Sequence, residues 1–214
     1  MHIVYACLAI LVAYILGSIP VGVLVTRLVS GIEITEIGSG RTGATNVYRA
    51  AGIWGLTLTT LGDVLKGVLS VQIAGFLTIL AQAVGPDSTW FSLIVPASGI
   101  AVVAGHNWSV FLHFRGGAGT VTTVGVLAAI NPWVAGAVVL LGLVAMVISR
   151  MASVGSITLA LAMGPALVIS AATNVTPWTW ASFGIVAGAF TVYRLLPNIR
   201  RILSGQERTL KLNH

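Results

Sequence analysis

The chain has 214 residues, of which 57% are apolar and only 7% are charged, and its mean hydropathy is +0.99. A water-soluble domain of this composition would expose far too much apolar surface, whereas about seven helices of roughly 20 residues would use most of its length, so we expect an all-α polytopic membrane protein. The formal charge of +6 does not indicate a nucleic-acid partner, because the basic residues are spread through short loops and a tail instead of forming one face with aromatics.

Apolar runs predict seven transmembrane helices, in the ranges 3–28, 54–83, 91–112, 119–131, 133–149, 154–173 and 177–195. The fourth is short for a full span. We expect it to begin inside the membrane after a re-entrant or broken RGGAG stretch, since irregular backbone is tolerated there only where protein buries it or a wet cavity adjoins it. No long-period repeat divides the chain, so residues 1–214 are predicted to form one domain with a basic tail at about 196–214.

The charges also predict an orientation. All eleven basic residues fall on one side of the predicted helices, which the positive-inside rule assigns to the cytoplasm, so the N-terminus is outside and the C-terminus inside. Trp90, Trp133, Trp178 and Trp180 lie near the uncharged connections, as an outer aromatic belt would. Because every chemically rich stretch is on the cytoplasmic side, the pattern favours an enzyme acting at one leaflet over a transporter, which needs a polar route through both faces.

The first predicted loop, EIGSGRTGATNVYRAAG at 36–52, is polar and rich in glycine. Gly38, Gly40 and Gly43 spell the G-x-G-x-x-G pattern of dinucleotide-binding folds, but that motif needs a parallel sheet that membrane helices do not supply. Glycines also expose backbone N–H groups that can wrap a phosphate. The donors beside them are Ser39, Thr45, Asn46 and the charged Arg49. A solvated loop with a capping serine is the alternative, and the residues alone do not decide between the two.

Two later stretches carry ionisable groups. GDVLKG at 62–67 places Asp63 and Lys66 on one helix face, where either a functional role or a salt bridge at the helix end explains them. GHNWSVFLHFRGGAG at 105–119 has His106 at a helix end, then an amphipathic segment, then Arg115 before glycines. This order predicts a short interfacial helix that leads into a second phosphate-type loop. The sequence leaves three roles open for His106: a base, a hydrogen-bond donor or a structural histidine.

Further polar residues follow on the same side. SRMASVGS at 149–156 adds Ser153 and Ser156, although small residues also let helices pack closely. The tail carries Asn198 among arginines, either for a direct role or as a basic segment resting on anionic lipid. The sequence contains neither a carboxylate cluster nor a Cys/His ligand set, so we expect no metal and no cofactor. The preferred ligand is an anion, and the substrate is expected to supply its own nucleophile.

In this order, the segments YILGSIPVG (14–22), IGSGRTGATNVYR (37–49), GDVLKG (62–67), GHNWSVFLHFRGGAG (105–119), SRMASVGS (149–156) and NIRRILSGQE (198–207) resemble the bacterial acyl-phosphate:glycerol-3-phosphate acyltransferases, the PlsY family. The resemblance implies a seven-helix enzyme of the bacterial inner membrane. Such an enzyme transfers a fatty acyl group from acyl phosphate to the 1-hydroxyl of glycerol 3-phosphate, giving lysophosphatidate and phosphate for phospholipid synthesis. The expected partners are these two substrates and membrane lipid, and a monomeric state is compatible with the sequence.

The resemblance also implies which residues act. It assigns phosphate and substrate contacts to Ser39, Thr45, Asn46, Arg49, Lys66, Arg115, Gly116, Gly117, Gly119, Ser153, Ser156 and Asn198. Three acceptors are possible for the proton of the attacking hydroxyl, and the sequence does not choose among them. They are His106, Asp63 and a phosphate oxygen of a substrate.

The chain departs from the family pattern at three positions. Arg41 stands where the family usually has Asn, Ala118 where it has Lys, and Leu195 where it has His. One hypothesis is that Arg41 restores the lost cation from the other loop. The alternatives are a non-catalytic or altered-specificity homologue, or a transporter of anions or phosphate esters.

Overall fold

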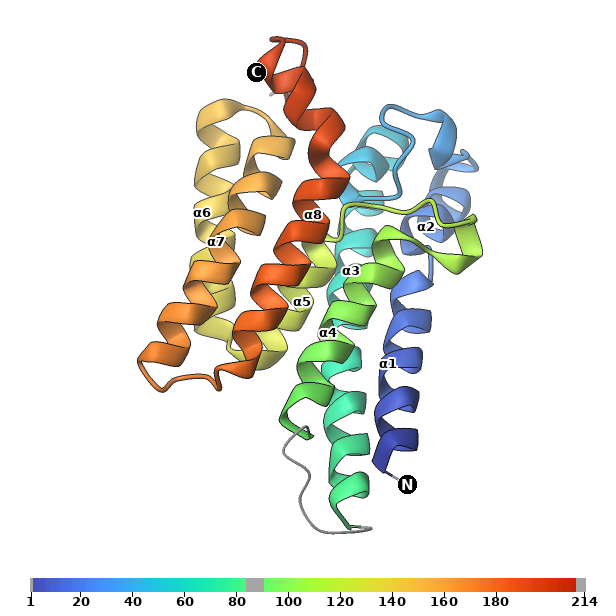
Figure 1. Ribbon diagram of the computed structural model, residues 1–214. Coiled ribbons are helices and arrows are strands. Elements are labelled where there is room, and N and C mark those ends of the chain that lie inside the picture. The colour runs from blue at the N-terminus through green and yellow to red at the C-terminus, as the bar shows by residue number, and fades with distance from the viewer. Residues whose placement is uncertain (1, 84–90, 211–214) are drawn as a thin grey trace.

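The computed structural model describes residues 2–83 and 91–210, and the regular elements in these ranges are all helical (Figure 1). In chain order they are α1 (His2–Ser18), α2 (Val21–Ser30), η1 (Ile34–Glu36), α3 (Ala44–Ala83), α4 (Phe91–Asn107), η2 (Val110–Leu112), α5 (Thr120–Ile130), α6 (Pro132–Ser149), α7 (Ala152–Ala172) and α8 (Thr179–Leu203). Among the described residues, six helical segments are long and apolar enough to cross a membrane. The apolar α5 has only 11 residues, so the fourth predicted helix is short, as expected.

The first predicted span is broken. In place of one helix over 3–28, the chain forms α1 and α2 with a break at Ile19 and Pro20. Proline has no backbone N–H and disfavours helical geometry at the residue before it, which explains the position of the break. Nζ of Lys66 lies 3.1 Å from the carbonyl oxygen of Gly17 and 3.4 Å from that of Ile19. The buried ammonium thus satisfies backbone groups that the break leaves without a helical partner.

Helix α3 starts ten residues before the predicted 54 and is kinked at Gly52, whose φ of 62° and ψ of −157° are not helical. This backbone region is accessible essentially only to glycine. The kink separates the first two turns, which carry Thr45, Asn46 and Arg49, from the part of the helix that crosses the bundle. The second half of the predicted polar loop is therefore helical, and its axis differs from that of the part of α3 after Gly52.

We expect Gly52→Ala to lower the stability of the folded protein by about 1–3 kcal/mol, the usual cost of a disfavoured backbone conformation. The cause is conformational and not steric, because no heavy atom lies within 4 Å of a Cβ built at this glycine. Thermal unfolding of the purified protein in detergent measures the effect. Gly75→Ala is the matched control, since Gly75 lies in the same helix, also has open space around it and has no positive φ. Equal melting temperatures for the two variants would contradict the explanation.

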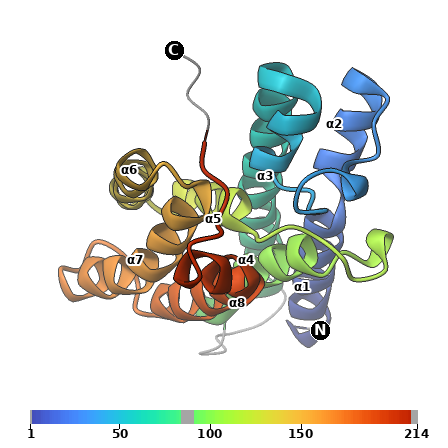
Figure 2. The ribbon, with the colours of Figure 1, turned by 90° about the horizontal axis from the view of Figure 1, so that it is seen from above.

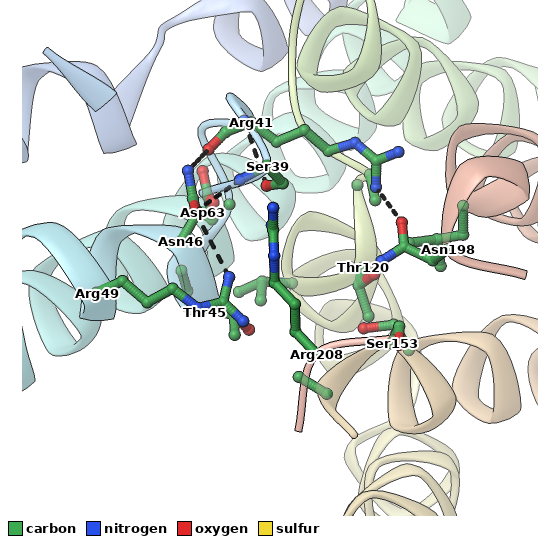
Figure 3. Close-up of a pocket in the computed structure, with 18 of the residues that line it drawn as sticks. Ser39, Arg41, Thr45, Asn46, Arg49, Asp63, Thr120, Ser153, Asn198 and Arg208 are labelled. Atoms are coloured by element: carbon green, nitrogen blue, oxygen red, sulfur yellow. Dashed lines mark hydrogen bonds between the residues drawn. The ribbon is translucent and has the colours of Figure 1, made fainter. Parts of the chain in front are cut away.

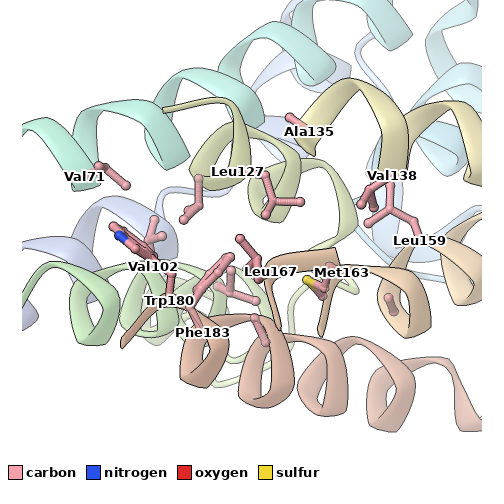
Figure 4. Close-up of a cluster of buried hydrophobic side chains, with 14 of the residues drawn as sticks. Val71, Val102, Leu127, Ala135, Val138, Leu159, Met163, Leu167, Trp180 and Phe183 are labelled. Atoms are coloured by element: carbon pink, nitrogen blue, oxygen red, sulfur yellow. The ribbon is translucent and has the colours of Figure 1, made fainter. Parts of the chain in front are cut away.

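The main apolar core lies where α4, α5, α7 and α8 meet (Figure 4). Val102, Leu127, Met163, Leu167 and Phe183 are all fully buried there. Helix α1 packs on α4, α3 packs on α5, and α6 packs on α7 at the outside of the bundle. These contacts hold the ends of α3, α5, α7 and α8 close together at the face that also carries the C-terminus (Figures 1 and 2).

Other boundaries differ from the prediction. The expected interfacial helix is a single 3₁₀ turn, η2, and α8 continues to Leu203, eight residues beyond the predicted end at 195. Of the predicted aromatic belt, Trp133 and Trp178 are exposed, and Trp90 falls outside the described residues. The assignment of Trp180 to the belt is wrong, because this side chain is only 9% exposed and packs against Phe183 in the core.

Candidate functional site

A polar pocket opens among the helix ends at the face of the bundle that carries the C-terminus (Figures 1 and 3). It contains about 790 Å³ of empty space, including the part open to solvent. Its walls come from the loop before α3, from the starts of α3, α5 and α7, and from the end of α8 and the segment after it. The lining residues are Ser39, Arg41, Gly43, Ala44, Thr45, Asn46, Arg49, Asp63, His106, Ala118, Gly119, Thr120, Val121, Ala152, Ser153, Ser156, Leu195, Asn198, Glu207 and Arg208.

Three helices begin at this pocket. The first residues of α3, α5 and α7 all line it. The first backbone N–H groups of a helix have no partner within the helix and carry partial positive charge, so they attract anions. Among the described residues, the backbone N–H groups of Ala44, Thr45, Thr120, Val121, Ala152 and Ser153 donate to no backbone carbonyl, and all of these residues line the pocket. The backbone alone therefore offers donors from three directions.

Three guanidinium groups add positive charge to the pocket (Figure 3). Nη1 of Arg41 donates to Oδ1 of Asn198 at 2.8 Å, across the pocket from the first loop to α8. Nη1 of Arg49 lies 3.5 Å from Oδ1 of Asn46, and Nη2 of Arg208 donates to the carbonyl oxygen of Gly38 at 3.0 Å. Among the described residues, none of the three arginines forms an ion pair with a carboxylate.

The two acids that line the pocket are already paired with other cations. Asp63 lies 2.8 Å from Nζ of Lys66, and Glu207 lies 2.7 Å from Nε of Arg201. Burial alone would raise the pKa of Glu207, but hydrogen bonds from Asn198, Arg201 and Ser153 outweigh it and hold the pKa below its usual value. Glu207 is therefore ionised at neutral pH, yet its charge is directed at α7 and α8. The three pocket arginines have no carboxylate in contact among the described residues, although Glu207 attracts Arg41 and Arg49 from a distance, and they call for an anionic ligand.

Asn46 shapes the first loop. Its side-chain amide donates to the carbonyl oxygens of Ile37 at 2.8 Å and Arg41 at 3.0 Å, and its Oδ1 accepts the N–H of Ser39 at 3.2 Å. The residue is only 3% exposed. Asn46 thus holds the loop in the curve that presents Ser39 and Arg41 to the pocket.

The floor of the pocket is a buried ionic cluster. Asp63 and His106 line the pocket, whereas Lys66 lies behind them and does not. Nζ of Lys66 is 2.8 Å from Nδ1 of His106, and Oγ1 of Thr122 is 3.2 Å from the same nitrogen. Oδ1 of Asp63 lies 3.5 Å from Nδ1 as well, so this ring nitrogen is in contact with the ammonium, the hydroxyl and the carboxylate. Lys66 therefore joins the pocket floor to the break between α1 and α2.

The glycine stretch before α5 packs directly on His106. A Cβ at Gly116 would overlap the carbonyl oxygen of His106, and a Cβ at Gly117 would overlap Nε2 of its ring, so only glycine permits this approach. Arg194 of α8 holds the stretch from the other side. Its Nη2 donates to the carbonyl oxygen of Gly116 at 2.7 Å and its Nε to that of Gly117 at 3.0 Å. Gly116 and Gly117 are buried beside the pocket, while the next residues line it.

We expect Arg194→Gln to raise KM for a phosphorylated substrate about tenfold, with a smaller change in kcat. The guanidinium fork fixes two successive carbonyls, and losing charged hydrogen bonds of this kind costs roughly 1.5–3 kcal/mol. Steady-state kinetics with each substrate varied in turn gives the two constants. Arg194→Lys should recover only part of the loss, because one ammonium cannot match the planar fork. Unchanged KM values in the Gln variant would exclude this positioning role.

The structure brings most of the sequence-predicted site residues to one pocket. Those that line it are Ser39, Arg41, Thr45, Asn46, Arg49, Asp63, His106, Gly119, Ser153, Ser156 and Asn198. Lys66, Gly116 and Gly117 support its walls, and Arg115 is exposed on the loop outside it. The three departures from the family pattern, Arg41, Ala118 and Leu195, also line this pocket.

Sequence reasoning did not assign Arg194, Glu207 and Arg208 to the site. Arg208 was interpreted only as positive charge on the cytoplasmic side, and for the tail segment that carries Arg194 a direct role and a contact with anionic lipid were both left open. A usable signal was present for Glu207, because an isolated acid in a strongly basic tail needs a partner, but the sequence does not say which residue that partner is.

Comparison with known proteins identifies relatives over nearly the whole chain. A family model described as glycerol-3-phosphate acyltransferase matches residues 7–205. Glycerol-3-phosphate acyltransferase 2 of Moorella thermoacetica is 41% identical over 204 residues, covering 95% of this chain and 96% of that protein. A glycerol-3-phosphate acyltransferase of Thermosynechococcus vestitus is 37% identical over 201 residues, covering 94% and 92%.

Solved structures agree with the sequence relatives. The crystal structure of PlsY, an integral membrane glycerol 3-phosphate acyltransferase, in its glycerol 3-phosphate form matches with a TM-score of 0.79 at 33% identity, covering 96% of this chain and 95% of that one. The lysophosphatidic acid form matches with a TM-score of 0.77. The chain therefore belongs to the glycerol-3-phosphate acyltransferase family.

Proposed function

We propose that this protein transfers a fatty acyl group from acyl phosphate to the 1-hydroxyl of glycerol 3-phosphate, at the cytoplasmic leaflet of a bacterial inner membrane. The observation that carries the proposal is the charge of the pocket. Arg41, Arg49 and Arg208 converge there without a carboxylate partner among the described residues, and the starts of three helices face the same space. Two phosphorylated substrates supply the anions that such a pocket lacks.

The proposed reaction needs no cofactor, because acyl phosphate is already activated. The hydroxyl oxygen attacks the acyl carbonyl carbon, the bond from that carbon to the phosphate oxygen breaks, and an ester and inorganic phosphate form. Holding both substrates in line is worth about 7–11 kcal/mol of the barrier. Donors directed at the developing negative charge contribute a further few kcal/mol each. Arginines, helix N-termini and the hydroxyl of Ser39 are suited to both tasks.

We infer that the hydroxyl proton passes to a phosphate oxygen of a substrate. Of the two protein groups that could accept it, Asp63 is paired with Lys66 at 2.8 Å. Nδ1 of His106 lies 2.8 Å from the same ammonium and 3.5 Å from Oδ1 of Asp63, so it is already engaged within the cluster. Both groups are therefore better suited to holding the pocket floor than to acting as a general base.

The orientation of the chain is part of the proposal. The positive-inside pattern supports a cytoplasmic C-terminus and an outer N-terminus. In the structure the two ends lie at opposite faces of the bundle, and the pocket is at the face of the C-terminus (Figure 1). Function as a monomer is also part of the proposal.

The direct test incubates purified protein with palmitoyl phosphate and glycerol 3-phosphate and follows lysophosphatidate and inorganic phosphate. We expect both products in equal amounts. Palmitoyl-coenzyme A in place of palmitoyl phosphate should give none, which tests the identity of the donor. Tight binding of glycerol 3-phosphate without turnover would instead support a non-catalytic homologue, an alternative that the relatives, named as acyltransferases, do not favour.

A further inference from the structure

We propose that Arg208, in the segment that follows the last helix, is a substrate-binding residue whose guanidinium holds a substrate phosphate together with Arg49. The inference rests on the proposed function and adds to it a binding residue from outside the helical bundle. The segment 205–210 is then part of the site and not a free basic tail.

The path of this segment is fixed at both ends. Gly205, with a φ of 68°, turns the chain away from α8, and the N–H of Gln206 donates to the carbonyl oxygen of Arg201 at 2.8 Å. At the other end, the N–H of Leu210 donates to the carbonyl oxygen of Arg150, between α6 and α7, at 2.7 Å. Seen from above, the segment runs from the end of α8 across the helix ends (Figure 2). It therefore spans the mouth of the pocket.

Glu207 anchors the middle of the segment. Its side chain is only 5% exposed. One carboxylate oxygen accepts from Oγ of Ser153 at 3.0 Å and from Nδ2 of Asn198 at 2.8 Å, and the other accepts from Nε of Arg201 at 2.7 Å. These three hydrogen bonds tie the segment to α7 and α8, so the backbone of the neighbouring Arg208 has a defined position.

From that position the side chain of Arg208 extends into the pocket between Arg49 and the residues Thr120 and Ser153 (Figure 3). Its Nη2 donates to the carbonyl oxygen of Gly38, in the first loop. Arg208 and Arg49 are like charges on the same side of the pocket, and the described residues place no carboxylate in contact with either. Such a pair repels itself unless an anion lies between the two groups, and a phosphate accepts several guanidinium donors at once.

Arg200 is an arginine of the same region that lies outside the pocket. It is exposed on α8, does not line the pocket, and its side chain has no hydrogen-bond or ion-pair partner among the described residues. A basic tail resting on anionic lipid would use groups placed like Arg200. Arg208 is exposed as well, but it lines the pocket and donates to Gly38, so a general attraction to the membrane does not explain its position.

The test compares Arg208→Gln with Arg200→Gln, which removes the same charge from the same region. In the acyl-transfer assay, we expect Arg208→Gln to raise KM for glycerol 3-phosphate or for palmitoyl phosphate about tenfold, and Arg200→Gln to leave both KM values within twofold. Arg208→Lys should lie between, because it keeps the charge and loses the fork. The melting temperature of each variant separates binding from a loss of folding. If the two Gln variants give the same KM values, the proposal is overturned.

A binding measurement separates this inference from the proposed function. Calorimetry in detergent with glycerol 3-phosphate, and then with inorganic phosphate, reports affinity whether or not the protein turns over. If the wild type binds glycerol 3-phosphate without acyl transfer and Arg208→Gln weakens that binding tenfold, the acyltransferase assignment fails and the Arg208 site stands. If the wild type is active and Arg208→Gln matches it in both affinity and KM, only the Arg208 site fails.

Discussion

An Arg41→Ala variant is expected to lose about 10- to 100-fold in kcat/KM for acyl transfer, which corresponds to roughly 1.4–2.8 kcal/mol of transition-state stabilisation. Arg41 places its positive charge on the side of the pocket that α5 and α8 form. The lining residues on that side, Ala118 and Leu195, have no charge of their own. Arg41 reaches them from the first loop, where its guanidinium meets Asn198 at 2.8 Å.

The surroundings of Arg41 explain why an anion should bind there. Burial, followed by the nearby charges of Arg194 and Arg201, lowers the pKa of Arg41 from its usual value. The direction means that its charge is held in an unfavourable environment, since burial and like charges both oppose the protonated form. A bound phosphate places a negative charge beside Arg41 and so stabilises its protonated form. This stabilisation contributes to the free energy of phosphate binding.

The measurement is steady-state kinetics with glycerol 3-phosphate and palmitoyl phosphate varied separately. Arg41→Lys should retain part of the activity, because the charge remains while the bidentate geometry is lost. Arg200→Ala is the control for removing one surface charge from the same face, and its kcat/KM should stay within twofold of the wild type. If Arg41→Ala behaves like Arg200→Ala, the cation that binds the phosphate on this side has to be another residue.

Lys66→Met is expected to have the largest effect on stability, a loss of about 3–5 kcal/mol, because it leaves the Asp63 carboxylate buried without its partner. The side chains of Lys66 and Asp63 are 6% and 2% exposed, so water cannot replace the ammonium. The carbonyl oxygens of Gly17 and Ile19 lose a donor in the same change. Since membrane domains tolerate few such groups in the bilayer, we expect little folded protein.

A double variant separates charge from packing. Adding Asp63→Asn to Lys66→Met removes the uncompensated carboxylate, so the double variant should melt at a higher temperature than Lys66→Met alone. Yield of folded protein in detergent and the melting temperature are the two measurements. A Lys66→Met single variant as stable as the wild type would show that the ammonium is dispensable at the break between α1 and α2.

The composition and hydropathy of the sequence predicted the all-α membrane fold well, because bilayer thickness fixes helix length and few alternatives exist for apolar runs of this size. The glycine-rich stretches at 38–43 and 116–119 were each expected to form a phosphate-type loop. The structure brings them to one pocket, which Gly43 and Gly119 both line. Periodicity did not predict the break at Pro20 and the kink at Gly52. Both have a local cause, a proline and a glycine, which hydrophobic periodicity does not register, and the contact of Lys66 with the break is not local.

The arginines of the candidate site also fall into two groups, those that the sequence indicated and those that it did not. Arg41 and Arg49 could be found because they sit in a stretch whose whole composition is unusual for a membrane protein. Arg194 and Arg208 could not, since cytoplasmic arginines are common and only the packing of α8 and the turn after it direct these two inward. Arg115 is the converse case: its position before the glycines is suggestive, but the loop turns its side chain to solvent.

The crossing of the helix ends by segment 205–210 also bears on biosynthesis. The pocket draws on residues from 39 to 208, so no early part of the nascent chain contains a finished binding site. All six long spans end before Glu207, so a product terminated just before that residue would keep the membrane helices and lack the segment that crosses the helix ends.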